Sequence, residues 1–72
     1  MNASRFFLID REGGPVDPAV LVTAVPNWTV GEAFSIGSGA RFRILEIRTN
    51  VARDLADAGF DGIFVVEREG DA

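Results

Sequence analysis

Apolar residues fall into five short runs along this chain, separated by stretches rich in glycine, proline and charged residues. Residues 5–10 (RFFLID) form the first run, which ends at REGGP, where two glycines and a proline interrupt regular structure. Residues 19–25 (AVLVTAV) form the second run, which is rich in β-branched residues and ends at Pro26. Runs of this length and composition are typical of β-strands, so we predict a strand at each.

Residues 33–36 (AFSI) and 41–48 (RFRILEIR) are predicted to be the third and fourth strands, joined by a tight turn. The connection contains Gly37 and Gly39, and glycine readily adopts the positive φ that hairpin turns need. A phosphate-binding loop is the alternative for such a stretch. However, Phe42 stands where a dinucleotide-binding loop needs its third glycine, and the chain has no lysine for a Walker A loop. A strand pattern follows instead of a helix, so we predict a hairpin.

The fourth predicted strand changes its apolar face midway. Phe42 and Ile44 share one face of an ideal strand, whereas Leu45 and Ile47 share the other. A β-bulge or a sharp coil near the junction of Ile44 and Leu45 would cause such a change. A central strand buried on both faces is the alternative. Both interpretations place this strand in the middle of the fold.

One passage has a helical pattern, and we predict a helix over residues 50–58. Thr49 or Asn50 can cap its N-terminus. At its C-terminus, Gly59 suits the left-handed position that ends a Schellman cap, with a leucine and a phenylalanine at the two positions that make apolar contact in this motif.

With a final strand over residues 62–69, the predicted order is β-β-β-β-α-β. The connections between most strands are too short for parallel crossovers, so we expect a mostly antiparallel sheet. A five-stranded barrel, closed or half-open, would bury this sheet and protect its edges. The predicted fold class is therefore mainly β: one SH3-like or OB-like barrel over residues 1–72, with one short helix before the last strand and a frayed tail at 69–72.

The amino-acid composition excludes most kinds of catalytic site. The 72 residues include no cysteine, histidine, lysine or tyrosine, so disulfides, thiolate or imidazole zinc ligands and a histidine general base are all absent. Serine and threonine therefore lack the usual activating base. The acidic residues do not follow the spacing of a calcium-binding EF-hand loop. We predict a protein that is not an enzyme, with no catalytic residues, no cofactor and no metal.

Charge and hydropathy also limit the partners. The formal net charge of −4 disfavours nucleic acid and anionic membranes, which repel an acidic chain. No apolar run is long enough for a membrane span, and the N-terminal sequence MNASRFFLID lacks the apolar core of a signal peptide. We therefore expect a cytoplasmic protein that has no contact with a membrane.

Two groups of residues are candidate binding surfaces. Trp28 follows Pro26 and Asn27, and it could be an exposed anchor for a partner or a lid on the core; the size of the domain favours the lid. If Trp28 is exposed, the predicted contact residues for a partner are Trp28, Val30 and Phe34. On the fourth strand, basic residues flank an aromatic residue in a pattern that can bind single-stranded nucleic acid, through Arg41, Phe42 and Arg43. The acidic net charge favours instead a solvated arginine face above a phenylalanine core.

The function expected from these features is that of a protein-interaction or accessory module. Its partner would be another protein or a second copy of the chain, bound through an exposed strand edge or through the apolar patch around Trp28. The alternative is a nucleic-acid-binding SH3-like or OB-like domain that uses the arginines and the phenylalanine of the fourth strand.

Residues 30–69 (VGEAFSIGSGARFRILEI…FDGIFVVERE) resemble a group of short proteins of unknown function from high-GC Gram-positive bacteria. That group combines a V/P-G-D/E-x-hydrophobic entry, a glycine-rich turn, an R-x-F/L-x-V strand and a final strand ending in V-V-E. The resemblance covers a little over half the chain. It implies a small β-barrel and supplies no functional residues.

Overall fold

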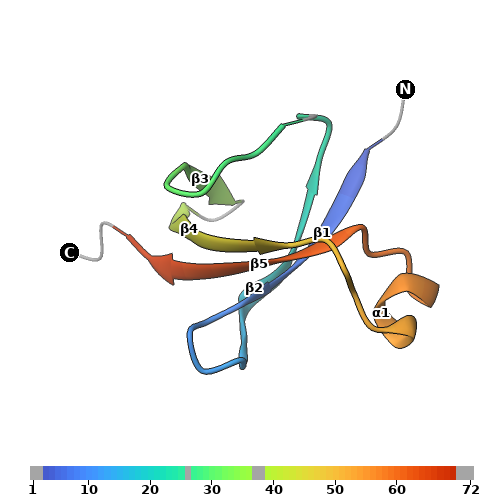
Figure 1. The fold of residues 1–72 in the computed structure, drawn as a ribbon. Coiled ribbons are helices and arrows are strands. Elements are labelled where there is room, and N and C mark those ends of the chain that lie inside the picture. The colour runs from blue at the N-terminus through green and yellow to red at the C-terminus, as the bar shows by residue number, and fades with distance from the viewer. Residues whose placement is uncertain (1–2, 26, 37–38, 70–72) are drawn as a thin grey trace.

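The computed structural model describes residues 3–25, 27–36 and 39–69. Within these residues the chain forms five strands and one helix, in the predicted order (Figure 1): β1 Ser4–Ile9, β2 Pro15–Thr23, β3 Ala33–Ile36, β4 Ala40–Arg48, α1 Arg53–Asp57 and β5 Gly62–Arg68.

The strands form one sheet of order β2-β1-β5-β4-β3, which curls into a half-barrel (Figure 1). The mainly-β prediction is confirmed. The sheet is mixed, because β1 runs parallel to β5 while the other three pairings are antiparallel. Short turns join β1 to β2 and β3 to β4, which makes these two pairs antiparallel, whereas no short connection joins β1 to β5 and constrains their direction. Within the described residues β2 and β3 do not pair with each other, so the barrel stays open between them.

The hydrophobic core lies on the concave face of the sheet. Alternate residues of each strand point to this face, so Phe64 and Val66 of β5 meet Leu8 of β1 and Ile44 of β4 there. Phe64 is fully buried, and its ring stacks on that of Phe6 with 4.2 Å between ring centroids. The sheet thus forms a core without a second layer because its own curvature brings these side chains together.

A β-bulge in β4 confirms the predicted break in its pattern. Ile44 pairs with Val66 and Glu46 pairs with Val65, so Leu45 is the extra residue between two consecutive partners on β5. The bulge turns Ile47 back to the concave face, where it packs against the core. It also adds to the bend that curls the sheet.

The predicted hairpin between β3 and β4 is also confirmed. Ile36 pairs with Ala40 across the turn, and the Gly39 N–H donates to the Ile36 carbonyl oxygen at 3.0 Å. Gly39 has φ of +97°, as predicted for a glycine in this connection. Gly37 and Ser38 lie outside the described residues.

Helix α1 begins three residues later than predicted and ends at Asp57, one residue before the predicted end. Ala52 is the N-cap and makes no side-chain capping bond, so neither Thr49 nor Asn50 has that role. The residues before it are poor helix formers, and a helix this short gains little from adding them. At the other end the Phe60 N–H donates to the Leu55 carbonyl oxygen at 3.0 Å, and Gly59 has φ of +92°. These are the bonds and the backbone of the predicted Schellman cap.

Strand β2 begins at Pro15, four residues before the predicted start. Pro15 pairs with Ile9, and the register then shifts before Val20 pairs with Phe7. Because β2 is an edge strand, Pro15 and Pro18 can lie in it without breaking a central ladder. The prolines therefore occupy the first half of β2, and residues 19–23 form its regular half.

Candidate functional site

The three residues of the patch predicted around Trp28 do not all lie at the surface. Phe34 lies in the core with 7% of its surface exposed, and Val30 is at the surface with 61% exposed. The Trp28 ring packs edge-on against Phe34 and Phe64, with centroids 5.7 Å and 6.0 Å away. This placement supports the lid interpretation, and of the three predicted contact residues it leaves Val30 as the exposed one.

Local bonds hold the loop that carries Trp28. The Glu32 carboxylate accepts hydrogen bonds from the N–H of Thr29 at 2.6 Å and from its hydroxyl at 3.0 Å. The Gly31 N–H then donates to the Ile44 carbonyl oxygen at 2.9 Å, which ties the loop to β4. The Trp28 indole Nε1 is buried and has no hydrogen-bond partner within the described residues. Its ring therefore contributes to the fold through packing.

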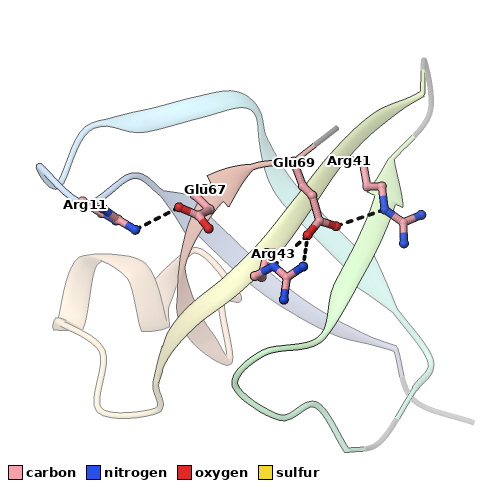
Figure 2. Close-up of polar contacts among 5 residues, drawn as sticks. All are labelled: Arg11, Arg41, Arg43, Glu67 and Glu69. Carbon is pink, nitrogen blue, oxygen red and sulfur yellow. Dashed lines mark hydrogen bonds and ion pairs between the residues drawn. The ribbon is translucent and has the colours of Figure 1, made fainter. Parts of the chain in front are cut away.

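The predicted nucleic-acid residues lie on opposite faces of β4. Phe42 is 2% exposed and points into the core, so its ring cannot stack on a base in this structure. Arg41 and Arg43 point outward, and both bind the carboxylate of Glu69 (Figure 2). The Arg41 Nε lies 3.2 Å from one Glu69 oxygen and the Arg43 Nε lies 2.7 Å from the other. Arg41 and Arg43 therefore form an outward arginine face above a phenylalanine core. The acidic net charge had favoured this arrangement over a nucleic-acid-binding surface.

Glu69 belongs to this cluster, although it was predicted both as the last residue of the final strand and as the first residue of a frayed tail. Its N–H donates to the Arg41 carbonyl oxygen at 2.7 Å, which continues the β4–β5 ladder by one residue. Residues 70–72 lie outside the described residues. Hydrogen bonds from Arg43 and then Arg41 lower the pKa of the Glu69 carboxyl group. A carboxyl group with a lowered pKa stabilises the fold above its unfolded pKa, and this contribution is lost as the pH falls through the folded value.

We expect Glu69→Gln to lower the melting temperature slightly at pH 7, because the exposed cluster loses its one carboxylate. The difference from wild type should shrink as the pH falls below the ordinary pKa of a glutamate and through the lowered pKa of Glu69, where the wild-type carboxyl group also becomes protonated. Thermal melts of both proteins from pH 7 to pH 2 would measure this. Glu12→Gln, in the exposed β1–β2 turn, is the control. An effect of Glu69→Gln that is constant with pH would contradict the ion-pair account.

Strand β2 offers an unpaired edge. It pairs with β1 on one side, and within the described residues no strand lies on its other side. Leu21 packs against the core, so Val20 and Val22 point to the convex face by strand alternation. Among the described residues the exposed large hydrophobic side chains all lie between positions 20 and 30: Val20 39%, Val22 58%, Val25 46% and Val30 61%. An exposed edge thus coincides with exposed apolar side chains.

This edge also lacks the usual protection. Residues 18–31 contain no charged side chain, in a chain whose charged fraction is 25%. Edge strands of soluble proteins usually carry charges, prolines or bulges that prevent pairing with another chain. Proline and the register shift provide this protection only in the first half of β2. The other edge strand, β3, is four residues long and has no exposed large hydrophobic residue. Residues 19–23 are therefore the part of the sheet most open to an added strand.

A second concave surface lies where β5 extends beyond the end of β1. Its volume is 440 Å³, and its apolar lining consists of Val16, Phe42 and Val66. The rim is charged, with both signs present: Asp10, Arg11, Glu12, Asp17, Glu67 and Arg68. The surface is large enough for a small molecule, and it is open to solvent.

Several of the rim charges already have partners within the protein. The Asp10 carboxylate accepts hydrogen bonds from the N–H of Glu12 at 2.9 Å and of Gly14 at 3.0 Å, which shape the β1–β2 turn. The guanidinium of Arg11 lies 2.9 Å from the Glu67 carboxylate (Figure 2). Much of the rim therefore serves the local structure.

Among the residues that the structure describes, no three acidic side chains are grouped so that they could hold a metal ion. In the same residues, no helix has the length and apolar character needed to cross a membrane.

Comparisons with known proteins give no relative. No protein-family model, no curated protein and no solved structure matches the chain. The resemblance to short proteins of high-GC Gram-positive bacteria therefore stays a prediction.

Proposed function

We propose that this domain is a non-catalytic protein-interaction module that accepts an extended segment of another chain as an added strand on β2. The observation that carries the proposal is the unpaired, uncharged edge at residues 19–23, with Val20 and Val22 exposed beside it. An SH3-like or OB-like barrel left open at one edge is the architecture we propose for this role.

Strand addition suits this edge for physical reasons. Alternate residues of an edge strand direct their N–H and C=O groups away from the sheet, and an added strand pairs with them. Those hydrogen bonds give affinity, while side chains on alternate positions give specificity. Val20 and Val22 would contact apolar residues two positions apart in the partner. Pro15 and Pro18 would limit the ladder to the second half of β2.

The nucleic-acid alternative has less support. Binding of single strands needs exposed aromatic rings beside basic groups, and Phe42 lies in the core below Arg41 and Arg43. Those arginines already share the Glu69 carboxylate. With a net charge of −4, the chain also lacks the electrostatic attraction that nucleic-acid binding requires.

A peptide-display selection tests the proposal without a known partner. Random short peptides would be selected against immobilised wild-type protein and then measured against two variants, Val22→Lys and Val30→Lys. These valines have similar exposure, 58% and 61%, but only Val22 lies in β2. We expect selected peptides with alternating apolar residues, and we expect Val22→Lys to weaken their binding about tenfold or more while Val30→Lys leaves it unchanged.

Two results would contradict the proposal. One is that the selection yields no binding peptide although the immobilised protein is monomeric. The other is that selected peptides bind Val22→Lys as well as wild type. If Val30→Lys were the variant that lost binding, the loop after Trp28 would be the surface instead of the β2 edge. Binding of single-stranded oligonucleotides that weakens steeply with salt would favour the nucleic-acid alternative.

A further inference from the structure

We infer that the strand added to β2 is β2 of a second copy of this chain, an inference that rests on the proposed function. The two strands would run antiparallel about a two-fold axis through Leu21. The half-barrels would then form one continuous sheet across the dimer.

The sequence of the free edge is nearly symmetric about Leu21. Residues 19–23 read Ala-Val-Leu-Val-Thr, so the strand presents the same pattern in both directions. In an antiparallel pair centred on Leu21, Val20 lies opposite Val22 of the second copy, and Ala19 lies opposite Thr23 of the second copy. Two-fold symmetric interfaces require a surface that is complementary to itself, and this stretch meets that requirement. Pairs of β-branched residues across antiparallel strands are also favourable.

No charged side chains would repel one another where the two β2 strands pair. Each copy carries a net charge of −4, but residues 18–31 contain no charged side chain. On β1, Phe7 pairs with Val20 and Arg5 pairs with Val22. Across the dimer, one row on the convex face would therefore read Phe7, Val20, Val22 of the second copy and Arg5 of the second copy. The two arginines lie at opposite ends of the paired rows, which keeps these like charges apart.

The geometry also limits the assembly to a dimer. An isologous pair uses the β2 edge of each copy once, so that edge is no longer available for further growth. In this register Pro18 faces Ala24 of the second copy, so the ladder ends where the prolines begin. The remaining edge, β3, is short and lacks exposed large hydrophobic residues among those described.

Sedimentation equilibrium gives the first test, across a concentration series from micromolar to millimolar. We expect wild type to dimerise reversibly, Val22→Lys to weaken dimerisation about tenfold or more, and Val30→Lys to match wild type. A wild-type chain that is monomeric over the whole series would overturn the inference. So would a dimer that Val22→Lys leaves intact.

Disulfide trapping tests the register, and the chain contains no cysteine that could interfere. Val20→Cys and Val22→Cys should crosslink when the two variants are mixed under oxidising conditions. Each variant alone should crosslink much less, because identical positions lie about 7–8 Å apart in this register. Crosslinking of either variant alone at the rate of the mixture would overturn the two-fold axis at Leu21.

The outcomes separate this inference from the proposed function. If the chain is monomeric but its selected peptides still require Val22, the self-pairing is rejected and the proposal of strand addition on β2 stands. A monomeric chain that selects no peptide would remove both.

Discussion

Phe64→Ala is expected to lower the free energy of unfolding by about 3–5 kcal/mol, the usual cost of removing a fully buried phenylalanine. Phe64 has no exposed surface, stacks on Phe6, and lies against the rings of Phe34 and Trp28. The cavity would open at the centre of a one-sheet fold that has no second layer to collapse onto it. In a chain of 72 residues the core rarely supplies more than about 3–5 kcal/mol of stability, so much of the variant should be unfolded at 37 °C.

Urea denaturation followed by tryptophan fluorescence measures this directly. The chain has one tryptophan, Trp28, and its ring centroid lies 6.0 Å from that of Phe64. Phe60→Ala is the matched control, because Phe60 is half-buried and packs edge-on against Phe7 outside the core cluster. Its cost should be clearly smaller. Equal costs for the two variants would contradict the assignment of Phe64 to the centre of the core.

Gly62→Ala is the second substitution with a large expected effect, a loss of about 1–3 kcal/mol in the free energy of unfolding. A Cβ at Gly62 would lie 2.9 Å from the Arg48 carbonyl oxygen and 3.1 Å from Cε1 of Phe6. The Arg48 backbone cannot easily move, because Arg48 pairs with Ile63 in the β4–β5 ladder. Phe6 is held by its stacking on Phe64. Insertion of a methyl group must therefore disturb the sheet or the core.

Gly14→Ala is the control for this substitution. The nearest atom to a Cβ at Gly14 is an Asp10 carboxylate oxygen at 3.6 Å, which is ordinary van der Waals contact. Its backbone is outside the left-handed region, so alanine is expected to change the free energy of unfolding by less than about 1 kcal/mol. Chemical denaturation of both variants provides the comparison. A Gly62→Ala protein as stable as wild type would show that the close approach of Phe6 and Arg48 is absent.

Patterns formed by a few neighbouring residues predicted much of this fold. The Gly-rich turn, the bulge near Leu45 and the Schellman cap at Gly59 each depend on a few neighbouring residues, and each is confirmed. The parallel pairing of β1 with β5 depends on residues more than 50 positions apart in the chain, and alternation within a strand contains no information on its neighbours. The predicted start of α1 was wrong: the sequence offers Thr49 and Asn50 as capping residues, but the helix begins after Ala52, which makes no side-chain capping bond.

The candidate surfaces were predicted less well than the strands. Alternation along β4 separates Phe42 from Arg41 and Arg43, and this signal was available in the sequence. Trp28, Val30 and Phe34 were grouped because they are close in sequence, whereas the pairing of Phe34 with Phe42 takes Phe34 into the core. An exposed edge was expected, but which strand forms it depends on sheet order. The absence of charge over residues 18–31 was the sequence signal that could have identified β2.

Residue-resolved amide hydrogen exchange over residues 19–23 tests the strand-addition edge most directly. Exchange would be measured by NMR at low protein concentration, at high concentration and with a display-selected peptide. We predict that alternate amides of this stretch exchange rapidly in the dilute monomer and become about tenfold or more slower when a strand is added, while those of Ala33–Ile36 in β3 do not change. Unchanged exchange over residues 19–23 in all three samples, or protection confined to residues 28–31, would contradict the proposal that β2 is the interaction edge.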